Sequence, residues 1–386
     1  MKLAVPKERR LHERRVAASP DTVKKLIQLG FDVVVEKDAG LNSSIPDSAF
    51  SAAGATIAAD AATTYQDADV IFKVQRPLHG NEGDIDEVSL IKPGAIVAAI
   101  LSPANDPASV EAYTNGNITA FAMEFMPRIT RAQSMDVLSS QSNLAGYRAV
   151  IDAAAAYSRA FPMMMTAAGT IAPAKVMVMG AGVAGLQAIA TAKRLGAVVS
   201  ATDVRAVAKE QVESLGGKFV MVESEETGET EGGYAKEMSD DYKAKQAELI
   251  ATTLAKQDIA ITTALIPGRT APVLITREMV QSMKPGSIIV DLAAEAGGNC
   301  ELTKAGEVVE ENGVKIIGHH NVPSLVSTDA SALFAKNLLN FITPLVDAEN
   351  KSLNIDWQDE IIVGTLLTKD GAIVHERLKP QNQGGN

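Results

Sequence analysis

The sequence predicts an α/β protein of two doubly wound domains, each built on a mainly parallel sheet. Short runs rich in branched apolar residues alternate with helical patterns along most of the 386 residues, which is the rhythm of βαβ units. Aromatic residues make up only 4% of the chain, so the core must consist mainly of aliphatic side chains, as in sheets covered by helices on both faces. The length exceeds one average domain and suits two.

The first series of elements runs from the N-terminus. Strands are expected at 2–5, 32–36, 70–74 and 95–100, where branched apolar residues stand near glycine or proline. A helix is expected at about 21–29, because Pro20 suits a helix start and Gly30 suits a helix end. These elements predict the first parallel sheet.

The second series follows a long helix expected at about 143–161. Strand and helix patterns alternate through it, as a parallel sheet requires. The expected strands are 175–179, 198–202, 218–221, 259–262, 287–292 and 314–318, and the expected helices are 183–195, 208–215 and 242–256.

The chain then ends in an apolar helix and a hairpin. The helix is expected at about 330–345, and the arms of the hairpin at 360–367 and 372–378. Between the arms stands Lys369-Asp370-Gly371, a strong turn signal.

The helix after Ser327 is expected to return the chain to the first domain, which is then discontinuous. The first Rossmann-like domain comprises residues 1–140 and 328–386 in this interpretation. The second, residues 141–327, is the NAD(H)-binding domain, for the reasons that follow.

Composition excludes several classes of protein. Lys and Arg number 36 and Asp and Glu number 47, so the formal net charge is −11, and the chain lacks the basic surface that nucleic acid or an anionic membrane requires. The single cysteine, Cys300, excludes an internal disulfide framework. The apolar stretch 171–192 contains Pro173, Lys175 and three glycines, which suits a strand, turn and helix better than a membrane span. We expect a cytoplasmic chain with no transmembrane helix.

A dinucleotide-binding fingerprint follows the strand expected at 175–179. Gly180 permits the tight turn, Gly182 lets the backbone approach a pyrophosphate, and Gly185 lets helix and strand pack closely. The next strand ends at Asp203, whose carboxylate would bind the adenosine ribose and repel a 2′-phosphate. This favours NAD(H) over NADP(H), although Arg205 nearby blurs the preference. The alternative is that the glycines serve only close packing.

The richest polar segment, 126–139, precedes the long helix. Arg128, Gln133, Asp136 and Ser139 would lie close together in a compact loop, which suits a binding role. The alternative is a capped helix start with Asp136 or Ser139 as the N-cap.

The histidines do not predict a metal site, because none is paired at helical spacing. A role for His320 as a general base is weighed against a structural role at a strand end, which is the commoner outcome.

At this point the residues resemble a known family, the NAD(H)-binding components of proton-translocating NAD(P) transhydrogenases. Alanine dehydrogenases are the nearest cousins and share the pattern from Pro6 to Pro20, with Arg15, and Lys73. The segments that carry the resemblance cover almost the whole chain and are 127–139, 175–185, 203–205, 232–236, 262–268 and 290–301.

Two positions separate the cousins. Alanine dehydrogenases use a catalytic histidine where this chain has Ser102, and their catalytic aspartate falls at Glu295. Losing the histidine removes a natural acid/base group, whereas hydride transfer between two nicotinamide rings needs positioning and no proton donor at the reacting carbons. The retained Arg15 and Lys73 are contrary evidence, unless they form inherited structural salt bridges.

The resemblance also implies a set of site residues. The residues implied around the nicotinamide and its ribose are Arg128, Ile129, Gln133, Asp136, Leu138 and Ser139, with Arg128, Gln133 and Asp136 as the catalytic set. Those implied at the pyrophosphate and the adenosine ribose are Gly180, Gly182, Val183, Ala184, Asp203, Val204 and Arg205. Gly233 and Tyr234 would belong to a loop closing over the nucleotide, and Ala264 and Leu265 would line the pocket. A solvated surface loop is the alternative for 223–233.

The implied activity is hydride transfer from NADH on this chain to NADP+ on a partner subunit, driven by proton flow through a membrane component. The implied partners are therefore the NADP(H)-binding subunit and the membrane subunit, and the implied assembly is a homodimer, peripheral at the inner face of the cell membrane. Two alternatives remain at this point. One is a self-sufficient NAD-dependent dehydrogenase of the alanine type, and the other is a non-catalytic NAD(H) sensor.

Overall fold

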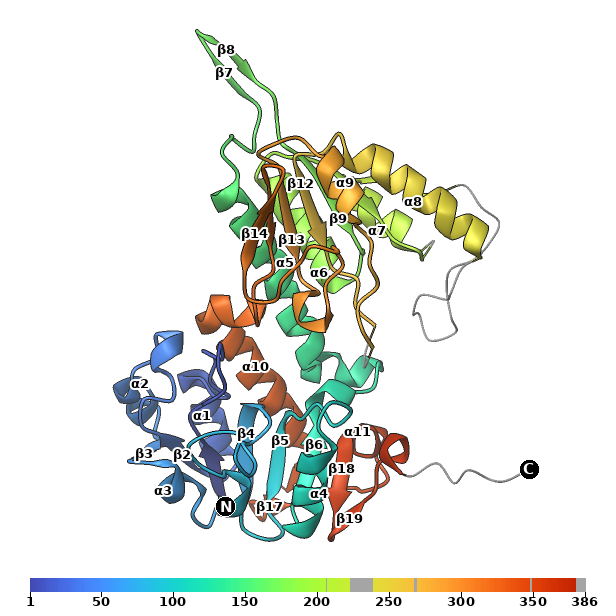
Figure 1. Cartoon of the computed structure of the whole chain (residues 1–386). Coiled ribbons are helices and arrows are strands. Elements are labelled where there is room, and N and C mark those ends of the chain that lie inside the picture. The colour runs from blue at the N-terminus through green and yellow to red at the C-terminus, as the bar shows by residue number, and fades with distance from the viewer. Residues whose placement is uncertain (206, 223–238, 267–268, 348, 380–386) are drawn as a thin grey trace, which may run out of the picture. The chain divides into compact units, whose positions relative to one another are not determined.

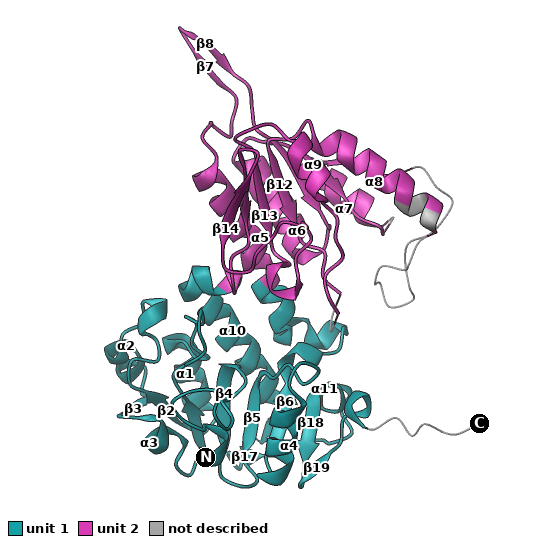
Figure 2. Cartoon of the chain, in the orientation of Figure 1, with its two compact units in different colours: residues 1–141, 324–386 teal, residues 142–323 magenta. Residues whose placement is uncertain are grey.

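The chain divides into two units, each with its own sheet (Figure 2). Unit 1 comprises Met1–Gln141 and Ser324–Asn386, and unit 2 comprises Ser142–Pro323. The computed structural model describes residues 1–205, 207–222, 239–266, 269–347 and 349–379. Both sheets are mainly parallel, and strands from both ends of the chain join the sheet of unit 1. The expected α/β class with a discontinuous first domain is therefore confirmed.

The sheet of unit 1 has the order β19-β18-β6-β5-β4-β1-β2-β3 (Figure 1). Its strands β1 to β6 pair in parallel, whereas β18 pairs antiparallel with β6 and with β19. The strands are β1 Lys2–Val5, β2 Asp32–Glu36, β3 Thr56–Ala58, β4 Val70–Gln75, β5 Ile96–Ile100, β6 Thr119–Ala122, β18 Leu366–Lys369 and β19 Ala372–Ile373.

Short helices connect these strands. They are α1 Pro20–Gln28, α2 Asp47–Ala52, α3 Ala61–Tyr65, α4 Pro107–Asn115 and α11 Glu360–Thr365, and the longer α10 Ser327–Ile342 packs beside them. The core of unit 1 draws fully buried aromatic rings from both ends of the chain, with Phe72 and Phe121 from the N-terminal segment and Phe334 and Phe341 from α10. This shared core is what makes the discontinuous unit cohere.

The expected terminal hairpin is half right. Its turn is confirmed, since Asp370 and Gly371 both have positive φ, at 51° and 70°. Its first arm is wrong, because residues 360–365 form helix α11 and the strand begins only at Leu366. The carboxylate of Asp359 accepts the backbone N–H of Ile361 and caps this helix, a signal that the apolar run behind it obscured.

The sheet of unit 2 has the order β11-β10-β9-β12-β13-β15-β14. All neighbours pair in parallel except β14, an antiparallel edge strand that the sequence patterns did not predict. The strands are β9 Lys175–Met179, β10 Val198–Thr202, β11 Lys218–Phe219, β12 Ile259–Thr262, β13 Ile288–Asp291, β14 Val308–Glu311 and β15 Val314–Ile317. The main helices are α6 Val183–Arg194, α7 Ala208–Ser214, α8 Asp240–Leu254 and α9 Arg277–Ser282.

The parallel strands of unit 2 follow the doubly wound dinucleotide-binding order, in which the chain reverses direction across the sheet between its first and fourth strands. Here that switch point lies between β9 and β12, which are hydrogen-bonded neighbours. Ligands of open α/β sheets bind outside the carboxyl ends of the strands at this point. The fold therefore directs attention to the residues that follow Met179 and Thr262.

Unit 2 also carries an exposed two-stranded ribbon that the sequence did not predict. It consists of β7 Met164–Thr166 and β8 Gly169–Ile171, paired antiparallel (Figure 1). Met163, Met164 and Met165 have exposed fractions of 60%, 45% and 78%, which is high for apolar side chains.

Two absences bear on the class of protein. In the described part of the chain, no helix is both long and apolar enough to cross a membrane. The same residues contain no group of three or more histidine, cysteine or acidic side chains that could hold a metal ion.

A candidate dinucleotide site

A glycine turn connects β9 to α6 in unit 2. Gly180 has φ of +100°, a left-handed conformation that favours glycine. A Cβ on Gly185 would lie 1.8 Å from the carbonyl oxygen of Gly180, so the turn closes only around a hydrogen at that position. Gly182 is the N-cap of α6 and offers no side chain to the first N–H groups of the helix. These groups and the positive end of the helix dipole suit a pyrophosphate.

Helix α5, Val137–Ala156, supports the start of α6. A Cβ on Gly146 would lie 2.0 Å from the carbonyl oxygen of Ala184, so the two helix backbones meet closely at this glycine. Val183 is 42% exposed and Ala184 is half-buried. Both residues of the first turn thus lie where the sequence predicts contact with the pyrophosphate.

Asp203 follows β10 and joins the glycine turn. Its carboxylate accepts the backbone N–H of Ala181 at 2.7 Å, and it forms a salt bridge of 2.9 Å with Arg205. Burial by itself raises the pKa of Asp203, but the hydrogen bonds from Arg205 and Ala181 outweigh it and the pKa lies below its usual value. Asp203 is therefore a carboxylate at neutral pH, as a ribose-binding residue must be. Val204, between the two, is half-buried.

The other side of the switch point is formed by the residues after β12. Thr263 donates a hydrogen bond of 3.0 Å through Oγ1 to the carbonyl oxygen of Gly180. Ala264 and Leu265 follow, and the side chain of Leu265 is 56% exposed. The structure thus brings together Gly180, Asp203 and the turn at Ala264, which sequence reasoning assigns to one site.

Two supporting residues were missed at this turn. Asn299, fully buried, pairs with both backbone groups of Ala264, accepting its N–H at 3.0 Å and donating to its carbonyl oxygen at 2.9 Å. The carboxylate of Asp291 in turn accepts the backbone N–H of Asn299 at 2.7 Å. Both lie in segment 290–301, which carries the family resemblance, and a buried Asp and Asn among small residues were the signal there.

The remaining predicted residues lie in unit 1, in and around the 3₁₀ turn η4, Thr130–Met135. Arg128, Gln133 and Leu138 are exposed, and Ile129 packs against the core of unit 1. Asp136 follows η4, and its carboxylate accepts both the backbone N–H of Ser139, at 2.9 Å, and its hydroxyl. Asp136 is therefore the cap of α5, so the helix-start alternative holds for this residue, and α5 begins earlier than expected.

The predicted residues Gly233 and Tyr234 lie outside the described residues. Of the two acid/base positions of alanine dehydrogenases, Ser102 has φ of +48° and donates its backbone N–H to the carboxylate of Glu124. Glu295 is exposed and accepts the backbone N–H of Asn321 at 3.1 Å, and the ring of His320 lies 3.4 Å from it.

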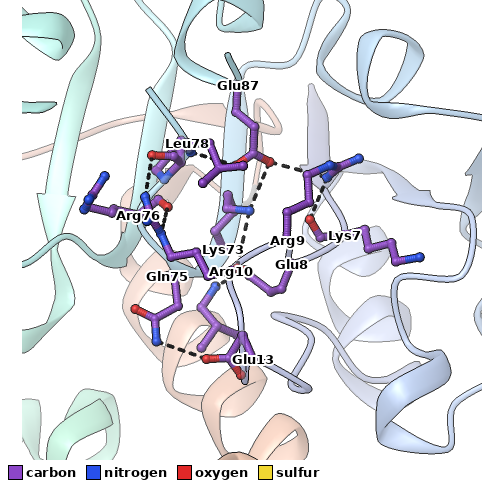
Figure 3. Close-up of polar contacts among 12 residues, drawn as sticks. Lys7, Glu8, Arg9, Arg10, Glu13, Lys73, Gln75, Arg76, Leu78 and Glu87 are labelled. Carbon is purple, nitrogen blue, oxygen red and sulfur yellow. Dashed lines mark hydrogen bonds and ion pairs between the residues drawn. The ribbon is translucent and has the colours of Figure 1, made fainter. Parts of the chain in front are cut away.

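The switch point of unit 1, between β1 and β4, holds buried ion pairs (Figure 3). Lys73 on β4 is 1% exposed and lies 3.1 Å from Glu87 and 3.4 Å from Glu8, which follows β1. Burial raises the pKa of Glu8 to about 7, against the opposing attraction of Lys73. Carboxylates of the chain thus satisfy the charge of Lys73 where other doubly wound sheets bind ligands.

Arg15 is likewise paired within the chain. Its guanidinium binds both carboxylate oxygens of Glu13, at 2.8 and 2.7 Å, and donates to the side-chain oxygen of Gln141 at 2.8 Å. The bidentate geometry is that of a strong charge-assisted pair. Arg15 and Lys73 are therefore structural ion pairs in this chain.

Comparison with known proteins identifies the family. Residues 4–145 match the family model "Alanine dehydrogenase/PNT, N-terminal domain", and residues 149–376 match "Alanine dehydrogenase/PNT, C-terminal domain". A relative from Rhodospirillum rubrum, the first of the parts into which its NAD(P) transhydrogenase subunit alpha is divided, is 64% identical. That match covers 99% of this chain and 100% of the relative.

Solved structures agree with the sequence match. The crystal structure of transhydrogenase from Sinorhizobium meliloti is 55% identical, with a TM-score of 0.87 over 97% of this chain and 100% of that one. An L-alanine dehydrogenase is 25% identical, with a TM-score of 0.80 over 98% of each chain. The chain therefore belongs to the alanine dehydrogenase/PNT family, within the group of the NAD(P) transhydrogenase α subunits.

Proposed function

We propose that this chain binds NAD(H) at the glycine turn of unit 2 and passes hydride directly to NADP+ on a partner subunit. The observation that carries the proposal is the switch point between β9 and β12, where Gly182, Asp203 and Ala264 surround the N-terminus of α6. A carboxylate at Asp203 suits the ribose hydroxyls of NADH and repels the 2′-phosphate of NADPH. When bound, the nicotinamide supplies the hydride chemistry, and the chain supplies binding, orientation and exclusion of water.

The turn η4 is the part of unit 1 that we assign to the reacting end of the nucleotide. Arg128, Gln133 and Asp136, with Ile129, Leu138 and Ser139, form one short segment whose exposed side chains are polar at the central positions. Gln133 carries two donors and two acceptors and no charge, so it suits orientation of a carboxamide or a second nucleotide. Direct hydride transfer needs this kind of positioning rather than a proton donor.

The partners follow from the same family. The name of the Rhodospirillum rubrum relative, which designates one portion of subunit alpha, implies further subunits in that protein. We assign the NADP(H) site and the proton channel to such subunits of this system, with this chain peripheral at the inner face of the cell membrane. A homodimer is supported by the ribbon β7–β8, whose exposed methionines would be covered by a second copy.

The alanine dehydrogenase alternative lacks its chemical groups. A 2-oxo acid needs an unpaired cation for its carboxylate, whereas Arg15 is bound by Glu13 and Lys73 by Glu8 and Glu87. Reductive amination also needs an acid/base group, and Ser102 replaces the histidine of that enzyme. The sensor alternative leaves the polar residues of η4 without a purpose.

One assay separates these alternatives. NADH oxidation by the purified chain is measured with pyruvate and ammonium, and then with the NADP(H)-binding partner subunit and NADP+. We expect turnover only with the partner. Turnover with pyruvate and ammonium alone would establish a dehydrogenase, and NADH binding without either reaction would favour the sensor.

Gln133→Ala tests the role of η4 within the same assay. Loss of its amide should slow hydride transfer at least tenfold, because a misplaced ring loses alignment with its acceptor. The dissociation constant of NADH should change less than threefold, since the adenosine and pyrophosphate contacts lie on unit 2. An unchanged transfer rate contradicts the assignment of Gln133. Asn115→Ala, at an exposed position on α4, is the control.

A further inference from the structure

Two asparagines of α10 hold the end of η4. The side-chain amides of Asn337 and Asn340 each donate a hydrogen bond of 2.9 Å to the carbonyl oxygen of Ser134. Ser134 follows Gln133 directly in the chain. Both lone pairs of this carbonyl are thus engaged by α10, which fixes the peptide plane next to Gln133.

Asn337 also reaches the start of α5. Its Oδ1 accepts the hydroxyl of Ser140 at 2.7 Å, and the residue is only 7% exposed. One planar amide therefore bridges Ser134, before Asp136, and Ser140, after it. Because the amide cannot bend, this bridge sets the direction in which η4 enters α5.

The bridge continues into the core of unit 1. Gln141 donates to the hydroxyl of Ser140 at 3.3 Å and to the carbonyl oxygen of Ala330 at 3.1 Å, and it accepts the guanidinium of Arg15 at 2.8 Å. Arg15 is itself held by Glu13. A buried ion pair thus anchors one end of a chain of hydrogen bonds whose other end is the backbone beside Gln133.

We propose that Asn337 is a positioning residue for hydride transfer, acting through Gln133 and Asp136. This inference rests on the proposed role of η4 in the reaction. Without Asn337 the bridge between η4 and α5 is lost, and a displacement of about 1 Å near a reacting centre is enough to slow a reaction about a hundredfold. Arg15 gains a purpose in this chain as the anchor of the bridge.

Asn337→Leu is the direct test, because leucine has a similar size and makes none of these hydrogen bonds. Hydride transfer from NADH to NADP+ on the partner should fall at least tenfold, with the NADH dissociation constant changed less than threefold. Asn340→Ala removes one of the two bonds to Ser134 and leaves the bridge intact, so its effect should be clearly smaller. Asn115→Ala should transfer hydride at the unmutated rate.

A double-mutant cycle with Gln133→Ala separates positioning from a general loss of structure. If Asn337 acts through Gln133, adding Asn337→Leu to Gln133→Ala should slow transfer less than twofold further. A full additional tenfold loss, or no loss in the single variant, overturns the proposal. If Asn337→Leu does not fold, Ser140→Ala breaks the bridge at its other end, and we expect about threefold slower transfer. A lack of transfer in the unmutated chain with its partner would instead refute the proposed function.

Discussion

The backbone N–H of Ala181 donates a hydrogen bond of 2.7 Å to the carboxylate of Asp203. This bond joins the glycine turn after β9 to the end of β10, so one side chain both shapes the turn and offers its charge to a ribose. The two tasks are separable, because an amide oxygen also accepts a hydrogen bond whereas only a carboxylate repels a phosphate.

Asp203→Asn should therefore retain the turn and lose the discrimination between nucleotides. We expect the preference for NADH over NADPH to fall about tenfold, equivalent to about 1.4 kcal/mol, since Arg205 then becomes a partner for the 2′-phosphate. Dissociation constants for both nucleotides, measured by calorimetry, test this. Asp84→Asn, at an exposed position, is the control. An unchanged ratio of the two constants contradicts the role of Asp203.

Gly182 and Gly185 should respond differently to the same methyl group. In Gly185→Ala the new Cβ would meet the carbonyl oxygen of Gly180 at 1.8 Å, so we expect a loss of about 2 kcal/mol in the free energy of unfolding, within the range for overpacking. At Gly182 no atom lies within 4 Å of a new Cβ, and φ is −75°. Gly182→Ala should keep its stability and bind NADH at least tenfold more weakly, because the methyl occupies the approach of the pyrophosphate.

Urea denaturation and NADH titration of the two variants check this pair. The reverse pattern, with Gly182→Ala destabilised and Gly185→Ala stable, would show that the turn does not hold the nucleotide as proposed.

Glu8→Gln should stabilise the chain at alkaline pH. Burial raises the pKa of Glu8 to about 7, above the ordinary value of 4.5 for an exposed glutamate. Between these values the folded chain keeps a proton that the unfolded chain has released, so this group's contribution to stability is full below pH 4.5 and is lost as pH rises through 7. Glutamine avoids that loss, which amounts to at most about 3 kcal/mol at about 1.4 kcal/mol per pKa unit.

Free energies of unfolding at pH 5 and pH 8 measure this effect. Glu8→Gln should match the unmutated chain at pH 5 and exceed it at pH 8, whereas the exposed Glu349→Gln should change neither value. A variant that is less stable than the unmutated chain at pH 8 would mean that the attraction between Glu8 and Lys73 outweighs burial.

Local patterns predicted much of the fold. The strand at 175–179, the glycine turn and the strand ending before Asp203 were placed correctly, because the period of apolar residues and the glycine spacing are set within a few residues. The residues 360–365 were misjudged because a short apolar run suits either strand or helix, and the cap at Asp359 decided the matter. The exposed ribbon β7–β8 carries no alternating pattern by which it could have been found.

The sequence by itself determined the α/β class, the dinucleotide turn and the family, since each depends on residues close together in the chain. The tertiary structure alone decided which cations are paired and which backbone is held. Asn337 and Ser134 are 203 residues apart and Arg15 and Gln141 are 126 apart, and no local pattern relates such residues. Their contacts follow from the packing of α10 and α5 against the first sheet, where buried polar groups must find partners.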